Sequence, residues 1–300
     1  MNSWIELSIN LPSEGADSIQ LFLEPLASNG CFSLNNPSSP EKSLICAYFS
    51  NMSDAEKARK QIYRQLKDQR KRSTYTFRYR TRLKKIEKPD YFFNWQKYFK
   101  PINIGKKITI CPTWIEHEPP KGRTLLKIDP GMAFGTGLSF TTRYCLDQIC
   151  RIATDKTNDF LDLGCGTGIL SATAKILGIQ TVTAVDNDPE AIEATWKNLK
   201  LNDLEYGCSV IHSNIEELTL NKQFSLVAAN LQLGIIKQNK AQIDKLVQIN
   251  GCLLVSGVLW AQKDKLLDLY KEWTLINIKH ERKKEWAGFC LRKNPAEKQI

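Results

Sequence analysis

The chain has 300 residues, of which 42% are hydrophobic and 25% charged, a composition typical of globular proteins and a length sufficient for two domains. No apolar run reaches the roughly 20 residues of a membrane span, and the N-terminus lacks the basic and apolar regions of a secretory signal. The nine cysteines stand singly, without the spacing of zinc ligands. We therefore expect a cytoplasmic protein with reduced, buried cysteines, no metal and no membrane contact.

Positive charge is concentrated in one stretch of the chain. Residues 56–107 contain 18 Lys or Arg and 4 Asp or Glu, a local charge of +14 within a total of +10. Such a basic block is typical of proteins that contact nucleic acid or a nucleoprotein. The alternative is that the block is a solvated helix end followed by a charged edge strand that discourages aggregation. Charge alone does not distinguish this alternative from contact with nucleic acid.

Residues 1–88 predict a ferredoxin-like domain with the element order β-α-β-β-α-β. The predicted strands either alternate apolar and polar residues or are short and apolar, and the predicted helices have apolar residues at helical spacing. We expect the first helix to end at Asn29-Gly30 and the second to begin with Ser53 as its N-cap and Glu56 completing a capping box. The predicted strands are 4–9, 31–34, 44–49 and 74–83.

Residues 89–120 predict a linker helix rich in aromatic residues, followed by a strand around "KKITICP". From residue 121 to residue 300 we expect a second domain. There, strands alternate with helices from Asp159 onward, which indicates a doubly wound parallel sheet. The last two strands have no helix between them and should form an antiparallel hairpin. Seven strands ending in such a hairpin are the architecture of class I S-adenosylmethionine-dependent methyltransferases.

The sequence "FLDLGCGTG" joins a buried strand to a helix through Gly164, Gly166 and Gly168. Glycines allow a sharp turn and the close approach of a ligand. Asp162 can hold the ammonium group of S-adenosylmethionine, and Asp186, at the end of the next strand, can accept the ribose hydroxyls. The longer G-x-G-x-x-G of nicotinamide enzymes is absent, so we favour S-adenosylmethionine as the cofactor over a dinucleotide.

Asn230 ends the fourth strand, at the position that faces the transferable methyl group in this architecture. Enzymes that methylate planar nitrogens often have Asn-Pro-Pro-aromatic here, whereas this chain has "NLQL". We therefore expect a different acceptor, with Asn230 as a candidate acceptor-positioning residue. The alternative is that Asn230 only caps the next helix. No general base is assigned, because water can accept the proton that the amine loses.

The stretch "DPGMAFGTGLSFTT", residues 129–142, resembles "DPGLAFGTGTHPTT" of the bacterial methyltransferase family that trimethylates protein eleven of the large ribosomal subunit. Nearly the whole chain shares this resemblance, including "NWQKYFKPINIGKKITICPTW", "LDLGCGTGILSATAKILG" and "AVDNDPEAIEATWKN". It implies that the first domain recognises the substrate and that stretch 129–142 folds over the cofactor. It also implies cofactor-contacting positions for Thr142, Gly164, Asp186 and Asn230, and a lining role for Phe134, Gly135 and Thr136.

One departure from the family pattern is that His-Pro is replaced by Ser139-Phe140. The resemblance implies methylation of lysine side chains or the N-terminal amine of a large-subunit ribosomal protein, and we expect a monomer. The alternatives are a methyltransferase for RNA or another protein, or a non-catalytic homologue that binds the ribosome or RNA.

Overall fold

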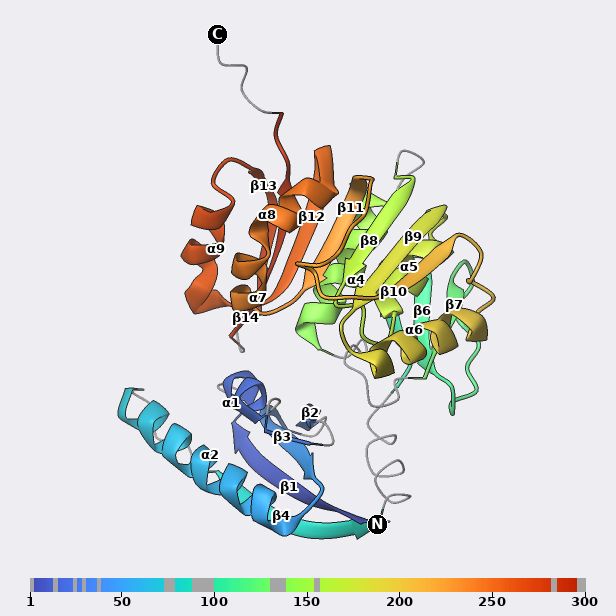
Figure 1. The fold of residues 1–300 in the computed structure, drawn as a ribbon. Helices are drawn as coiled ribbons and strands as arrows, with labels where there is room; N and C mark the ends of the chain where they lie inside the picture. The colour runs from blue at the N-terminus through green and yellow to red at the C-terminus, as the bar shows by residue number, and fades with distance from the viewer. Residues whose placement is uncertain are drawn as a thin grey trace. The chain divides into compact units, whose positions relative to one another are not determined.

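The computed structural model describes residues 3–12, 16–23, 26–28, 31–36, 39–72, 79–87, 100–129, 139–153, 157–281 and 285–295. The chain divides into two compact units (Figure 1). The first comprises Met1–Phe99 with Arg282–Glu285, and the second comprises Lys100–Glu281 with Trp286–Ile300. Among the described residues, every helix is too short or too polar to span a bilayer.

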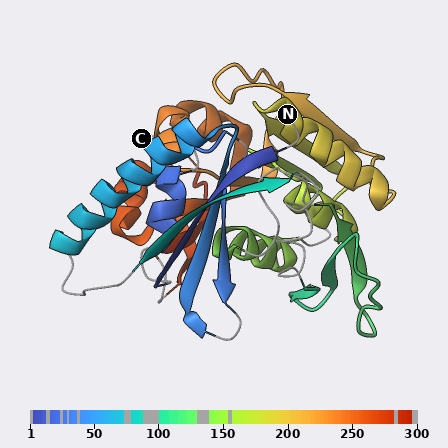
Figure 2. The ribbon, with the colours of Figure 1, turned by 90° about the horizontal axis from the view of Figure 1, so that it is seen from below.

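The first unit is a four-stranded antiparallel sheet with two helices on one face (Figure 2). Its strand order, β2-β3-β1-β4, confirms the ferredoxin-like prediction. Alternate residues of β1, from Ile5 to Leu11, point into a core shared with both helices, as the two-residue period of a strand requires. The elements are β1 Ser3–Pro12, α1 Ala16–Leu23, β2 Cys31–Asn36, β3 Ser39–Phe49, α2 Met52–Arg72 and β4 Arg80–Glu87.

The helix ends of this unit differ from the sequence prediction. Helix α2 begins at Met52, and Asn51 rather than Ser53 caps it, because its Oδ1 accepts the backbone N–H of Asp54 over 3.0 Å. Asparagine and serine are comparable N-caps, so local preference alone does not choose between two such residues this close together. Helix α1 ends at Leu23, whose carbonyl accepts the N–H groups of two later residues in a turn.

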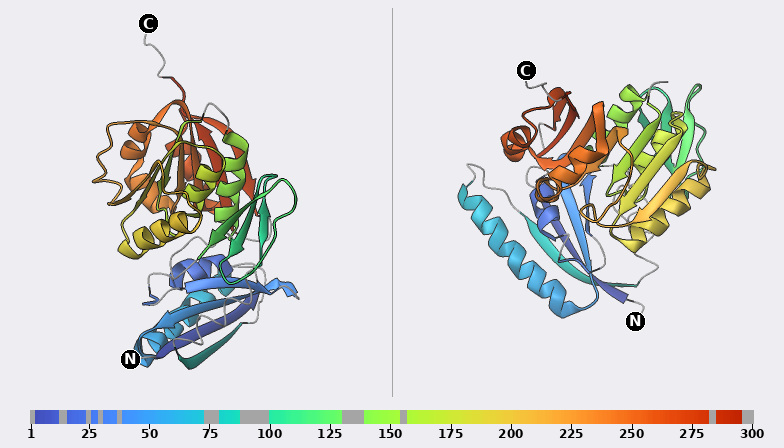
Figure 3. Two further views of the ribbon diagram at one scale, coloured as in Figure 1. Left: turned by 90° about the vertical axis from the view of Figure 1, so that its right-hand side faces the viewer. Right: turned by 45° about the horizontal axis from the view of Figure 1, so that its top comes forward.

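The second unit contains a seven-stranded sheet with the order β10-β9-β8-β11-β12-β14-β13. β14 is antiparallel to both neighbours, whereas the other pairs are parallel, so the predicted final hairpin is confirmed. Helices cover both faces (Figures 1 and 3). The strands are β8 Asp159–Leu163, β9 Thr181–Asp186, β10 Cys208–His212, β11 Phe224–Asn230, β12 Val247–Leu259, β13 Thr274–His280 and β14 Trp286–Arg292.

Two apolar cores lie on opposite faces of this sheet. Phe160 packs with α4, α5 and α6, whereas its neighbour Leu161 packs with α7, α8 and α9. This alternation is expected where both faces of a parallel sheet are covered. The helices are α4 Phe140–Ile152, α5 Ile169–Ile176, α6 Pro189–Leu201, α7 Leu233–Gln238, α8 Lys240–Leu246 and α9 Lys263–Leu269.

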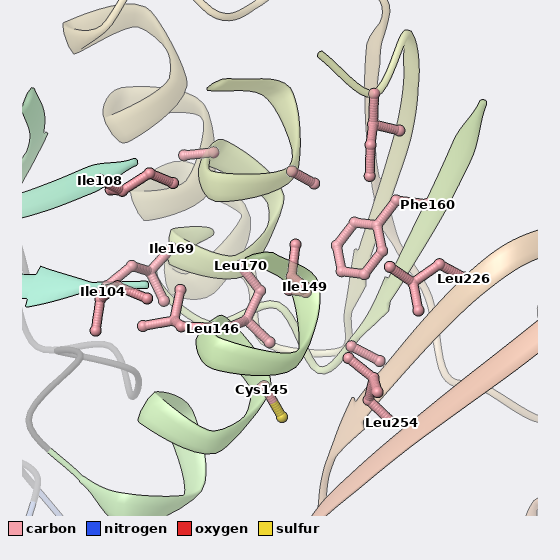
Figure 4. Close-up of a cluster of buried hydrophobic side chains, with 14 of the residues drawn as sticks. Ile104, Ile108, Cys145, Leu146, Ile149, Phe160, Ile169, Leu170, Leu226 and Leu254 are labelled. Atoms are coloured by element: carbon pink, nitrogen blue, oxygen red, sulfur yellow. The ribbon is translucent and has the colours of Figure 1, made fainter. Parts of the chain in front are cut away.

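A small three-stranded sheet completes the second unit. It consists of β5 Ile102–Ile104, β6 Ile108–Pro112 and β7 Thr124–Ile128, so the strand expected around "KKITICP" is present. Ile104 and Ile108 join the core formed by α4 and α5 (Figure 4). The linker helix expected within 89–99 lies outside the described residues. The small sheet, including β7, is therefore packed against the core of the second unit.

Candidate active site

The glycine loop lies between β8 and α5. The N–H groups of Gly164 and Cys165 donate to the carbonyl of Val185 over 2.8 and 3.1 Å, which ties the loop to β9. Gly164 has φ +73°, and a Cβ there would lie 2.6 Å from Leu231 Cδ2. Gly168 has φ +74°, and its Cβ would lie 2.8 Å from Thr195 Cγ2. Only glycine combines this backbone conformation with such close packing.

Asp186, at the end of β9, has a carboxylate held by two backbone N–H groups. Oδ2 accepts from Gly166 over 2.9 Å, and Oδ1 accepts from Asp188 over 3.1 Å. Asp188 in turn caps α6 by accepting from Glu190 over 2.9 Å. Because each carboxylate oxygen has a second acceptor position and Asp186 is only partly buried, the group fits the two hydroxyls of a ribose.

Asp162 lies within β8, beneath the glycine loop, with only 1% of its surface exposed. Its Oδ2 accepts a 2.7 Å hydrogen bond from Ser171 Oγ of α5. Burial raises the pKa of the Asp162 carboxyl to about 7, the hydrogen bond from Ser171 opposes that rise, and the charge of Asp186 adds to it. A cation near this carboxyl would favour its ionised form, which suits the ammonium group assigned to it from the sequence.

Thr142 and Asn230, which are 88 positions apart, meet at the end of β11. Asn230 Nδ2 lies 3.5 Å from Thr142 Oγ1, at the outer limit of a hydrogen bond. Ser139 Oγ donates to the same Thr142 Oγ1 over 2.9 Å and accepts the Thr142 N–H over 3.3 Å as the N-cap of α4. Phe140 stacks on Tyr144 at 6.3 Å between ring centroids. The Ser-Phe departure from the family pattern thus provides a helix cap and a ring contact.

The alternative that Asn230 only caps the next helix is wrong. Helix α7 begins at Leu233, and its N-cap is Gln232. Asn230 Oδ1 is buried and has no hydrogen-bond partner among the described residues. A buried acceptor without a partner is costly, so this atom is suited to receive an N–H group from a bound molecule.

The structure therefore brings most of the predicted site residues to one edge of the sheet, where β8, β9 and β11 end. Phe134, Gly135 and Thr136 lie outside the described residues, and their lining role remains a prediction. Sequence reasoning missed Asn198 of α6, which is fully buried. The sequence did contain an indication of this residue: Asn198 is polar but lies seven positions after Ala191, on the buried face of the helix.

The sheet order, the glycine loop and the acidic residue at the end of β9 define a class I methyltransferase that depends on S-adenosylmethionine. Comparison with protein families matches residues 3–294 to Ribosomal protein L11 methyltransferase (PrmA). The chain belongs to this family. The match covers both units, as the resemblance described above implied.

Individual relatives support this assignment. A ribosomal protein L11 methyltransferase of Geotalea daltonii is 31% identical over 312 residues, covering 97% of this chain and 98% of that protein. One of Thermoanaerobacter pseudethanolicus is 33% identical over 213 residues, covering 71% and 68%. The crystal structure of a ribosomal protein L11 methylase of Lactobacillus delbrueckii subsp. bulgaricus has a TM-score of 0.60 and 25% identity, covering 66% of this chain and all of that one.

Proposed function

We propose that this protein transfers methyl groups from S-adenosylmethionine to amino groups of ribosomal protein L11, either lysine side chains or the N-terminal amine. The family match over residues 3–294 supports this, because it includes the unit that carries no glycine loop. The chemistry rests on Asn230, which lies beside Thr142 at the edge where Asp186 also lies. Its Oδ1 has no hydrogen-bond partner within the part of the chain that the structure describes.

The residues of the chain have separate roles in this proposal. When bound, the cofactor supplies an electrophilic methyl group. Asp186 holds the ribose, and the loop at Gly164 and Gly166 approaches the cofactor closely. Asn230 Oδ1 accepts an N–H of the incoming amine and so directs the nitrogen lone pair toward the methyl group. Burial favours the neutral amine, and water can accept the proton that it loses.

We assign substrate recognition to residues 1–88 and transfer to residues 121–300, with 89–120 joining them. The first unit has its own apolar core and a ferredoxin-like sheet, a fold that often serves as an interaction module and fixes no chemistry by itself. On the face of the sheet opposite the helix-packed Leu83, Tyr48 is buried and donates to Glu6 over 3.0 Å. We expect this open face of the sheet, or the aromatic residues of the linker, to make the specific contacts with L11, and the exposed Arg80, Arg82 and Lys84 of β4 to be peripheral to them.

Two groups of exposed basic residues from the block lie on the described part of the first unit. Arg80, Arg82 and Lys84 alternate along β4 on the face opposite Leu83, which packs into the helix-covered core. The exposed basic side chains of α2 lie across that core; they include Lys57, Lys60 and Arg64. We propose that the β4 row contacts ribosomal RNA, because a basic L11 acceptor would gain nothing from it by simple attraction.

The β4 row also suits the alternative interpretation, since β4 is an edge strand. Two triple charge reversals decide between them: Arg80, Arg82 and Lys84 to Glu, and, as the matched control, Lys57, Lys60 and Arg64 to Glu. RNA contact through β4 predicts weaker, less salt-dependent binding of ribosomal RNA for the first variant only. Equal binding by both variants would leave edge protection as the function of the row.

The central experiment incubates the full-length protein and labelled S-adenosylmethionine with purified ribosomal protein L11 and, separately, with ribosomal RNA. We expect label on the protein and none on the RNA. Label on RNA alone would replace the proposed acceptor, and cofactor binding without transfer to either substrate would indicate a non-catalytic homologue. We also propose that the protein is a cytoplasmic monomer. Sedimentation of the same preparation tests whether it is a monomer.

A further inference from the structure

Asn198 of α6 and Asn202, the C-cap of that helix, form hydrogen bonds with the backbone at the end of β7, in the pattern of a neighbouring strand. Asn202 donates to Lys127 O over 2.7 Å and accepts from Lys127 N over 2.8 Å. Asn198 pairs in the same way with Asp129, donating over 2.9 Å and accepting over 2.7 Å. Four helical residues rise about 6 Å and two strand residues span about 6.6 Å. The spacing of the two asparagines therefore matches the spacing of the two backbone sites.

Asn198 also binds the glycine loop. Its Nδ2 donates to Thr167 O over 2.9 Å, in addition to its bond to Asp129 O. The amide thus uses both of its protons and its oxygen, and the side chain is fully buried. One turn earlier on α6, Thr195 Oγ1 donates to Gly166 O over 3.0 Å. Helix α6 therefore holds two successive carbonyls of the loop, from the side where Gly168 packs on Thr195.

We propose that Asn198 is a positioning residue for the cofactor, which fixes the glycine loop relative to Asp129. This inference rests on the proposed function, because it requires S-adenosylmethionine to bind against the loop. A loop with three glycines at positive φ loses much conformational entropy when it is ordered. Asn198 imposes that order before the ligand arrives. Binding then avoids the ordering cost, which is the general advantage of a preorganised site.

A purely structural role for Asn198 makes a different prediction. The bonds to Asp129 alone would anchor β7 and contribute to stability, as those of Asn202 to Lys127 do. Removing them would lower the unfolding temperature and leave the affinity of the folded protein for its cofactor unchanged. The bond to Thr167 O, by contrast, acts on the loop itself. Cofactor affinity measured on folded protein therefore separates the two roles.

The test compares Asn198→Asp with Asn202→Asp in the full-length protein. Both changes keep the size and the oxygen that accepts a backbone N–H, and both remove the N–H donors. Only Asn198→Asp loses a bond to the glycine loop. We expect S-adenosylmethionine to bind Asn198→Asp about tenfold more weakly by calorimetry, the loss typical of one or two hydrogen bonds. We also expect the rise in unfolding temperature on adding cofactor to shrink. Asn202→Asp should keep its cofactor affinity within about twofold.

Asn198→Ala removes the same donors without adding a charge, and it replaces Asn198→Asp if the buried carboxylate prevents folding. A folded Asn198 variant with wild-type cofactor affinity would overturn the inference. Equal losses of affinity in the Asn198 and Asn202 variants would do the same, since they would point to the β7 anchor rather than the loop. Failure of the wild-type protein to bind S-adenosylmethionine would instead refute the proposed function, and this inference with it.

Discussion

Asp186 Oδ2 accepts the backbone N–H of Gly166 over 2.9 Å, which joins the end of β9 to the turn that follows β8. The acidic side chain and the glycine loop therefore form one hydrogen-bonded unit rather than two independent motifs. A hydrogen bond from a backbone N–H to a carboxylate is stronger than one between neutral groups. The carboxylate is thus oriented before a ligand binds.

Asp186→Ala should weaken S-adenosylmethionine binding by at least about tenfold. The change removes one or two charge-assisted hydrogen bonds to the ribose, each contributing about 1.5–3 kcal/mol. Calorimetry on the full-length protein measures the loss. Asp188→Ala is the matched control, because it removes the cap of α6, should cost about 1 kcal/mol of stability and should leave affinity nearly unchanged. An unaltered dissociation constant for Asp186→Ala would refute the ribose assignment.

Ser139→Ala should lower the free energy of unfolding by about 1 kcal/mol, because it removes the N-cap of α4. It also removes the donor to Thr142 Oγ1. Ser139→Thr keeps a capping hydroxyl and should stay within a few tenths of a kcal/mol of wild type. Urea unfolding of the three proteins checks both expectations. If Ser139→Ala were as stable as wild type, the cap would contribute nothing measurable.

Asp162 should make the stability of the ligand-free protein depend on pH. Its pKa is raised from 3.8 to about 7 in the folded state, chiefly by burial. Below pH 4 the carboxyl is protonated in both states, so folding does not bury a charge at this position. Between about pH 4 and pH 7 the unfolded state loses the proton first, so stability falls as pH rises. Asp162→Asn should lose this dependence.

The measurement is the unfolding temperature of wild type and Asp162→Asn at pH 5 and pH 8 without cofactor. We expect wild type to lose more stability than the variant on going from pH 5 to pH 8. Parallel changes in the two proteins would show that Asp162 keeps an ordinary carboxyl pKa. Ser171→Ala should raise the pKa of Asp162 further, because Ser171 is the donor that opposes the effect of burial.

Deletion of residues 1–88 should abolish methylation of ribosomal protein L11 and leave cofactor binding nearly intact. The second unit has its own cores on both faces of the seven-stranded sheet, which should keep it folded. Calorimetry with S-adenosylmethionine verifies the folded state, and transfer of label to L11 measures the activity. A truncated protein that methylates L11 at the full-length rate would refute the assigned division of roles.

Much of the fold could be predicted because its signals are local. The missing helix between the last two strands predicted the antiparallel position of β14. The start of α2 was not predictable in this way, because Asn51 and Ser53 are both good caps and only packing selects one of them. Between β11 and β12 the chain forms two short helices, α7 and α8, which are divided at Asn239.

Gly164 and Asp186 could be predicted as site residues because each belongs to a motif. In such a motif, the residue type and its position at the end of a strand indicate its role. Asn198 has no such motif, since its partners Asp129 and Thr167 lie 69 and 31 positions away in the chain. Asn230 was recognised by its position, but its contact with Thr142 across 88 positions required the folded sheet. Long-range hydrogen bonds therefore account for what sequence reasoning could not supply.

The regular rise of α6 makes the site sensitive to insertions and deletions. One residue inserted between Pro189 and Asn198 would turn the rest of the helix by about 100°, moving Asn198 and Asn202 away from the backbone they hold. The following turn, where Tyr206 is 95% exposed, could lengthen without this effect. Changes in chain length should therefore be tolerated after α6 and excluded within it, even where every side chain of the site is retained.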